Sequence, residues 1–169
     1  PPPPSPPPPA SPLVADSSAA LVAQFEAIYA IESAGLLVEI VVTPGDHSDL
    51  PTLELNASVV ASGVSLVGGS APAHARSLSA SSADATTTAT ASDEVTLSAK
   101  AGVPLLRTLP GAPRLQVRGL RLRGQVHVSG SHVDFDDCAF EDSHATEGGA
   151  LAVVDGGVVA ATGCSFTSN

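Results

Sequence analysis

Apolar and polar residues alternate along the last third of the chain, and the same alternation occurs three times. The copies begin at Leu115, Val133 and Val159, with offsets of 18 and 26 residues. Superposing them gives four columns that are small or apolar in every copy: Leu115, Val133 and Val159; Val117, Phe135 and Ala161; Leu120, Cys138 and Cys164; Leu122, Phe140 and Phe166. Alternation of this kind predicts strands, and offsets of this size are typical of solenoid repeats.

A two-residue corner resets the alternation within each copy: Arg118-Gly119, Asp136-Asp137 and Thr162-Gly163. Each copy is therefore predicted to form two short strands that meet at a bend, where Asp and Gly tolerate left-handed backbone. Stacked coils bury each inward column, and their backbones bond to the rungs about 4.8 Å away on either side. The pattern predicts an all-β chain that folds as a parallel β-helix.

Two short motifs resemble the repeats of a known group of proteins. Residues 148–151 read Gly-Gly-Ala-Leu, and Phe166 is followed three residues later by Asn169. These motifs resemble the Gly-Gly-Ala-Leu/Ile and Phe-x-x-Asn repeats of right-handed β-helix proteins, which include the polymorphic outer-membrane and pectin-lyase-like families. The resemblance implies a right-handed parallel β-helix. It does not choose a function, because adhesins, structural proteins and polysaccharide-cleaving enzymes share this fold.

The amino-terminal half begins with the one predicted helix, at about residues 17–34. Asp16, Ser17 or Ser18 can cap it and Gly35 is expected to end it, while an apolar stripe is formed by Leu21, Val22, Phe25, Ile28, Tyr29 and Ile31. A β-branched run over residues 36–42 then ends at Thr43-Pro44-Gly45. This order resembles the amino-terminal cap of pectin-lyase-like β-helices, which implies that the helix covers the open end of the first coil.

Between the cap and the clear repeats, the pattern is weaker. We expect coils at Leu53–Leu55 and at residues 59–69, where Val64 and Leu66 echo Leu120 and Leu122. Residues 71–102 are mostly small and polar without a period, so they are predicted to be a long surface loop that carries O-glycans, touches a partner or has no role. The β-helix would thus span residues 13–169. Because the chain opens on proline and has no methionine, we expect it to be a piece of a longer protein whose coils continue.

Residues 1–12 form a separate segment, PPPPSPPPPASP, in which proline fixes φ and leaves few backbone donors. A polyproline II rod is predicted. Ser5 and the four prolines after it resemble the Ser-Pro4 unit of extensins and other hydroxyproline-rich glycoproteins of plant and green-algal walls. The resemblance implies hydroxylation and O-glycosylation at Pro1, Pro2, Pro3, Pro4, Ser5, Pro6, Pro7, Pro8, Pro9 and Pro12. The alternatives are an interdomain linker and a ligand for a proline-binding domain.

A second modification site is indicated by Asn56-Ala57-Ser58, an acceptor sequon for N-linked glycan in a secreted protein. The two cysteines, Cys138 and Cys164, share one inward column on adjacent rungs. Their α-carbons are then about 4.8 Å apart, within the range that a disulfide accepts. Parallel neighbours rarely offer the side-chain dihedral of a disulfide, so two buried free thiols are the other interpretation.

The acidic net charge of the chain argues against some classes of binding partner. The net charge of −10 argues against nucleic acid and anionic membrane surfaces, and no apolar run approaches the roughly 20 residues of a membrane span. The densest acidic cluster is Asp134, Asp136, Asp137, Glu141 and Asp142. A polysaccharide-acting enzyme could use such groups for acid–base chemistry or for calcium. However, the repeat alignment places Arg118 beside Asp136 and Arg123 beside Glu141, with Thr162 and Thr167 on the next rung. This arrangement predicts surface ion pairs instead.

No other pattern of catalysis is present. The histidines, His47, His74, His127, His132 and His144, lack zinc-site spacing, and no motif of a nucleophile or a phosphate-binding loop occurs. We therefore predict no catalytic or metal-ligating residue and no cofactor apart from covalent glycans, with calcium unsupported.

Together these features predict a secreted, glycosylated structural protein rather than an enzyme. It would belong to a cell wall, matrix or appendage such as a flagellar-hair, or mastigoneme-like, fibre. Its partners would be other subunits of that assembly, further copies of itself, and glycans. The main alternative is a polysaccharide-binding or polysaccharide-cleaving β-helix protein of the pectin-lyase-like type. A bacterial adhesin or autotransporter passenger shares the repeats but would not account for the Ser-Pro4 unit.

Overall fold

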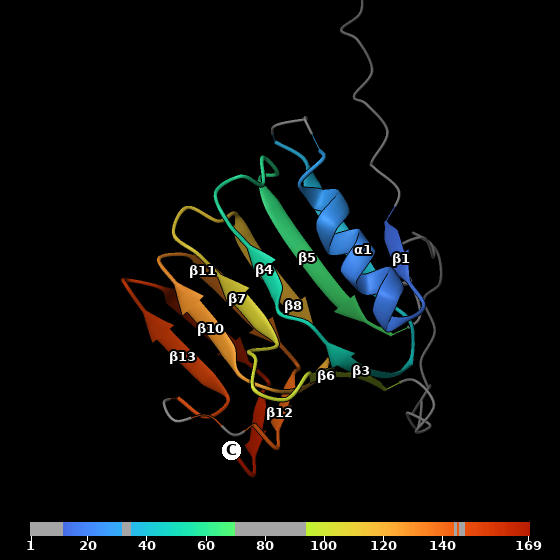
Figure 1. Ribbon diagram of the computed structural model, residues 1–169. Coiled ribbons are helices and arrows are strands. Elements are labelled where there is room, and N and C mark those ends of the chain that lie inside the picture. The colour runs from blue at the N-terminus through green and yellow to red at the C-terminus, as the bar shows by residue number, and fades with distance from the viewer. Residues whose placement is uncertain (1–11, 32–34, 70–93, 144, 146–147) are drawn as a thin grey trace, which may run out of the picture.

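Three parallel sheets wrap around one apolar core in the computed structural model, which describes residues 12–31, 35–69, 94–143, 145 and 148–169 (Figure 1). Sheet A has the order β1-β2-β5-β8-β11-β14, sheet B the order β15-β12-β9-β6-β3, and sheet C the order β13-β10-β7-β4. The chain visits A, B and C in turn with each coil. This topology confirms the parallel β-helix.

The strands are short, three to six residues each. Sheet A contains β1 (Leu13–Ala15), β2 (Leu37–Val42), β5 (Gly63–Gly68), β8 (Arg114–Arg118), β11 (His132–Asp136) and β14 (Val158–Thr162). Sheet B contains β3 (Gly45–Leu50), β6 (Val95–Ala99), β9 (Arg121–Arg123), β12 (Ala139–Glu141) and β15 (Ser165–Thr167). Sheet C contains β4 (Leu53–Leu55), β7 (Leu106–Thr108), β10 (Val126–Ser129) and β13 (Leu151–Val154).

Three of the four inward columns predicted from the repeats are confirmed by the strand register, and the fourth, at Leu120, Cys138 and Cys164, lies between the paired strands of sheets A and B. In sheet A, Val133 pairs with Leu115 and Val159, and Phe135 pairs with Val117 and Ala161. In sheet B, Phe140 lies between Leu122 and Phe166. The alignment of the coil at residues 59–69 was wrong by one strand. Its Val64 and Leu66 pair with Leu115 and Val117, because β5 belongs to sheet A and not to sheet B.

Corners between sheets A and B use left-handed backbone, as predicted. Gly119, Asp137 and Gly163 occupy this corner on successive coils with φ of 62°, 52° and 65°. At the last of them the Asp137 carboxylate occupies the space of a β-carbon, since a Cβ built on Gly163 would lie 2.3 Å from Oδ1. Aspartate on one coil thus favours glycine on the next.

The Phe-x-x-Asn motif has a direct structural explanation. The Phe166 ring stacks on Phe140 with centroids 4.6 Å apart and planes 1° from parallel. The Asn169 side chain donates to the carbonyl of Phe140 at 2.9 Å and accepts from the amide of Ser143 at 3.0 Å. The motif therefore joins one coil to the preceding one through a ring stack and a pair of backbone hydrogen bonds.

The helix α1 (Ser18–Ile28) packs across the first coil and covers its end, next to β1, β2, β3 and β4 (Figure 1). Ser17 is the N-cap, and its hydroxyl accepts from the amide of Ala20. Leu21, Phe25 and Ile28 are buried. The helix is shorter than predicted, since i to i−3 hydrogen bonds at Tyr29, Ala30 and Ile31 tighten its last turn. Gly35, with φ of 89°, is therefore not its terminator.

The predicted loop over residues 71–102 is also corrected. Its part at β6 is a strand of sheet B, in which Thr96 and Leu97 pair with Arg121 and Leu122. Val95 and Leu97 are buried, so two alternating apolar residues are enough to extend an existing sheet. The remainder of the loop up to residue 93, and residues 1–11, lie outside the described residues.

Candidate functional site

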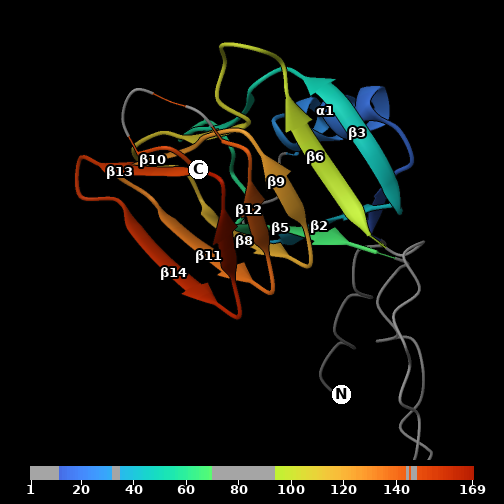
Figure 2. The same cartoon turned by 90° about the horizontal axis from the view of Figure 1, so that it is seen from below.

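One rung of the β-helix is basic, and most of its acidic partners lie on the following rung, with Glu94 on the preceding side. The basic rung consists of β8 and β9 (Figure 2). The outward residues of these strands include Arg114, Arg118, Arg121 and Arg123. The carboxylates face these arginines because parallel register places equivalent positions of adjacent rungs side by side. We refer to this set of arginines and their carboxylates as the ion-pair ladder.

Every arginine of the basic rung has an acidic partner. Arg114 Nε lies 2.5 Å from Asp134, Arg118 Nε lies 3.3 Å from Asp136, and Arg121 Nη1 lies 2.5 Å from Glu141. Arg121 also contacts Glu94 on the other side, and Arg123 lies 3.5 Å from Glu141 and 3.9 Å from Asp142. The predicted pairs Arg118–Asp136 and Arg123–Glu141 are confirmed.

Two of the carboxylates, Asp134 and Glu141, are made stronger acids by their arginine partners. The hydrogen bond from Arg114 lowers the pKa of Asp134, with a smaller contribution from His132, whose Nε2 lies 3.0 Å from the carboxylate. The hydrogen bond from Arg121 lowers the pKa of Glu141. In turn Asp134 raises the pKa of Arg114, and Glu141 with Glu94 raises that of Arg121. A general acid at neutral pH needs the opposite shift, so the ladder is organised for ion pairing rather than for proton donation.

The remaining titratable candidates include a corner aspartate and two histidines with buried ring atoms. Asp137 occupies the corner beside Gly163, and the buried His47 bonds through Nε2 to the carbonyl of Thr43 at 3.1 Å. His127 has its Nδ1 buried without a hydrogen-bond partner. His74 and His144 lie outside the described residues. In the part of the chain that the structure describes, no three His, Cys, Asp or Glu side chains gather closely enough to hold a metal ion.

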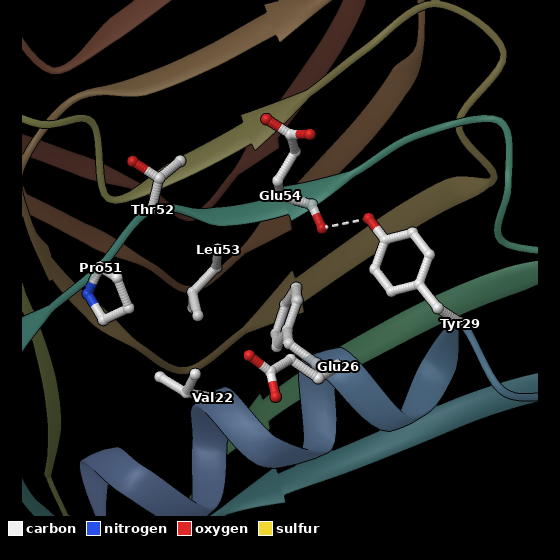
Figure 3. Close-up of a pocket in the computed structure, with 8 residues that line it drawn as sticks. Val22, Glu26, Tyr29, Pro51, Thr52, Leu53 and Glu54 are labelled. Atoms are coloured by element: carbon white, nitrogen blue, oxygen red, sulfur yellow. Dashed lines mark hydrogen bonds between the residues drawn. The ribbon is translucent and has the colours of Figure 1, made fainter.

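A small groove between α1 and β4 was not predicted from the sequence (Figure 3). It has a volume of about 240 Å³ and is lined by Val22, Phe25, Glu26, Tyr29, Pro51, Thr52, Leu53 and Glu54. The Tyr29 side chain reaches across the groove, and its hydroxyl donates to the carbonyl of Glu54 at 2.7 Å. Partial burial, followed by the charge of Glu54, raises the pKa of that hydroxyl. In the sequence, Tyr29 belongs to the apolar stripe of the helix. Helical periodicity alone does not distinguish a tyrosine in this groove from one in the core.

Only some of the predicted glycosylation sites lie within the described residues. Asn56 follows β4 in an exposed turn, where its Oδ1 accepts from the amide of Ser58 at 2.8 Å. Ala57 and Ser58 are exposed, so the sequon lies at the surface. Pro12 is exposed as well. The other predicted sites, Pro1 to Pro9 with Ser5, lie outside the described residues.

The two cysteines lie on adjacent rungs, and both are free thiols in this structure. Cys138 is buried, and Cys164 is partly exposed. Burial raises the pKa of the Cys138 thiol to about 11, and the neighbouring Cys164 adds to this shift. The uncharged thiol is therefore the stable form of Cys138 at neutral pH.

No protein-family model, curated protein or solved structure matches this chain. Its class is consequently defined by its own architecture, which in the described residues is a parallel β-solenoid with one short amino-terminal helix. Among the described residues, α1 is too short to cross a membrane, and no other helix there is long and apolar enough to do so.

Proposed function

We propose that the chain is a secreted, glycosylated structural protein of an extracellular fibre, wall or matrix, with the β-helix as its rigid body. The observation that carries this proposal is the ion-pair ladder. Its charged side chains connect one rung to the next across three consecutive rungs, outside a core whose apolar columns are already continuous. Charge pairs between rungs fix the register of one rung on the next, which a rigid body requires.

Each ion pair of the ladder is weak by itself, because a solvent-exposed pair such as Arg118–Asp136 contributes about 0–1 kcal/mol to the free energy of unfolding. The ladder therefore adds geometric definition more than stability. Within a solenoid each rung contacts only its neighbours, so the register of every interface must be set locally. Arginine suits this task because its planar fork reaches two acceptors, as Arg121 does with Glu94 and Glu141.

The amino-terminal segment supports the extracellular part of the proposal. Its Ser-Pro4 unit resembles hydroxyproline-rich glycoproteins, and a polyproline II rod of this kind is a stiff spacer that rises about 3.1 Å per residue. The finer assignment, to a green-algal wall or mastigoneme-like glycoprotein, belongs to this resemblance and to the Gly-Gly-Ala-Leu and Phe-x-x-Asn motifs. In this proposal the glycosylated rod supplies reach and hydration, and the flanks of the solenoid bind neighbouring subunits.

Glycopeptide mass spectrometry on the native protein tests this proposal. We expect pentose-bearing hydroxyproline within residues 1–12 and a glycan on Asn56. Unmodified prolines together with a bare Asn56 would contradict the proposal. Cleavage of plant-type or algal polysaccharides by the full-length protein would then favour the polysaccharide-acting alternative.

A matched pair of variants isolates the Asn56 site in a secreting eukaryotic host. Ser58→Ala removes the sequon and should abolish the mass of one N-glycan. Ser62→Ala changes an equally exposed serine nearby outside the sequon, and it should leave the glycan in place. If both variants carry the wild-type glycan mass, Asn56 is not the site.

A further inference from the structure

The thiols of Cys138 and Cys164 are related by the same translation that relates their rungs. Cys138 Sγ donates to the carbonyls of Val117 at 3.5 Å and Asp136 at 3.4 Å. Cys164 Sγ makes the same two contacts one rung further on, with the carbonyls of Phe135 at 3.5 Å and Thr162 at 3.4 Å. These acceptors are register partners, since Val117 pairs with Phe135 and Asp136 with Thr162.

Identical contacts on successive rungs mean that the two side chains have the same orientation. The backbone fixes this relation on both sides of the cysteines, through Asp137 N donating to Thr162 O and Ser165 N donating to Cys138 O, each at 2.9 Å. The sulfur atoms are consequently separated by one rung spacing, about 4.8 Å. A disulfide requires about 2.05 Å between sulfurs and about 3.8 Å between β-carbons, so both rotamers and the rung spacing would have to change.

We propose that this pair binds one soft, two-coordinate monovalent cation, of the Cu(I) or Ag(I) class, between the two sulfurs. Zinc–thiolate bonds are about 2.3 Å long, and with bonds of similar length a linear sulfur–metal–sulfur unit spans about 4.6 Å and fits between undisplaced rungs. Thiolate sulfur selects such cations over hard ones. This site does not depend on the proposed structural function.

The binding step is a proton exchange without redox change. Each S–H bond breaks, both protons leave to solvent, and two metal–sulfur bonds form on a cation whose oxidation state is unchanged. The bound unit carries one negative charge in place of two neutral thiols. The bound cation takes the place of the thiol proton on each sulfur. A high thiol pKa therefore does not prevent coordination at neutral pH.

The surroundings favour a low coordination number. Leu120 and Cys138 lie in the same column with 2 % exposure each, so one side of the pair is closed by hydrocarbon. The partly exposed Cys164 provides the path of entry. Zinc and calcium need four or more ligands, and no cluster of three candidate ligands exists among the described residues.

Titration of the reduced full chain with Ag⁺ in chloride-free buffer tests the site by native mass spectrometry, because Ag⁺ needs no reductant. We expect one tightly bound Ag⁺ per chain, displacing two protons, and a higher melting temperature on binding, since the ion links two rungs. Cys138→Ala and Cys164→Ala should each weaken binding by roughly 100-fold or more, because the second sulfur acts at high effective concentration. His132→Asn, which removes another soft surface ligand, should bind like the wild type.

Three results would overturn the proposal. The first is equal Ag⁺ affinity in wild type and in the folded Cys164→Ala variant, which alters the less buried cysteine. The second is binding of two ions per chain with independent affinities. The third is a disulfide between Cys138 and Cys164 that forms in air and is detected as the loss of two hydrogens. To overturn the proposal, this disulfide must also form again after reduction when one equivalent of Ag⁺ is present. Circular dichroism identifies any variant that fails to fold, and Cys138→Ser then replaces Cys138→Ala.

Discussion

The amino-terminal rungs and the middle rungs of sheet A have the same interior and different exteriors. Inside, Val38 and Val64 continue the column of Leu115 and Val133. Outside, one column of sheet A runs from Val41 and Val67 in the amino-terminal rungs to Arg118 and Asp136 in the middle rungs. The inward residues set the fold, and the outward residues are free to define a surface. In the amino-terminal rungs this outer column is apolar, and in the middle rungs it forms an ion pair.

The largest expected effect is the loss of an inward aromatic residue. Phe135 is fully buried and meets Phe140 edge-on at 5.1 Å, so Phe135→Ala should lower the free energy of unfolding by about 3–5 kcal/mol. Its outward neighbour supplies the control, since Asp136→Ala should cost no more than about 1 kcal/mol. Urea unfolding measures both. Similar losses in the two variants would refute the division of labour between the two faces.

The next effect concerns the junction between the two regions. A β-carbon on Gly68 would lie 2.5 Å from the carbonyl oxygen of Gly119 and from Leu120, so the missing side chain lets the amino-terminal rungs approach the basic rung. Gly68→Ala should cost about 1–3 kcal/mol by overpacking against backbone that cannot move away. Exposed Ser62, at the start of the same coil, provides Ser62→Ala as a control with little effect. An unchanged midpoint in urea for Gly68→Ala would show that the junction is loose.

The smallest effect is the pH dependence of the ion-pair ladder. The pKa of Glu141 is lowered in the folded chain, so its ion pairs contribute stability above the unfolded-state pKa, near 4.3, and lose it as pH falls through the folded value. Glu141→Gln should remove up to about 1 kcal/mol at pH 7, and less in high salt. At pH values below the folded pKa the variant and the wild type should converge.

Melting curves of Glu141→Gln at pH 7 and at acidic pH, with and without added salt, measure this difference. Glu39→Gln on the amino-terminal rungs is the matched control, because the register places Glu39 beside Ser65 and not beside arginine. A Glu39→Gln variant with the same acid and salt response as Glu141→Gln would mean that the ladder has no special contribution.

The sequence predicted the middle rungs well because their inward columns repeat in order, from Leu115 through Val133 to Val159. It misassigned Val64 and Leu66 because two apolar residues two apart, followed shortly by glycine, read alike in sheets A and B. Only long-range pairing separates the two cases. Sheet C was predicted only at Leu53–Leu55, which is β4, and the rest of it was missed for a related reason. Its strands in the repeats, such as β10 and β13, are four residues long and lie between the copies that the alignment recognised.

Surface features were predicted where they depend on register and missed where they depend on packing angle. The Arg118–Asp136 pair follows directly from stacking the copies. The groove beneath Tyr29 requires knowing how α1 lies across β4, and helical periodicity does not contain that angle. The end of α1 at Ile28 is similar, because i to i−3 hydrogen bonds tighten the last turn and helical periodicity does not reveal them.

The parallel sheets also determine how the molecule would respond to a mechanical load. Backbone hydrogen bonds between rungs point along the stack, so a pull spread over a whole rung is shared by all the bonds of one interface at once. A pull on a single strand instead loads the bonds of that rung one after another and peels it away. A body of this kind resists traction from molecules attached along its flanks better than traction on its backbone, so where the attachments lie decides how strong it is.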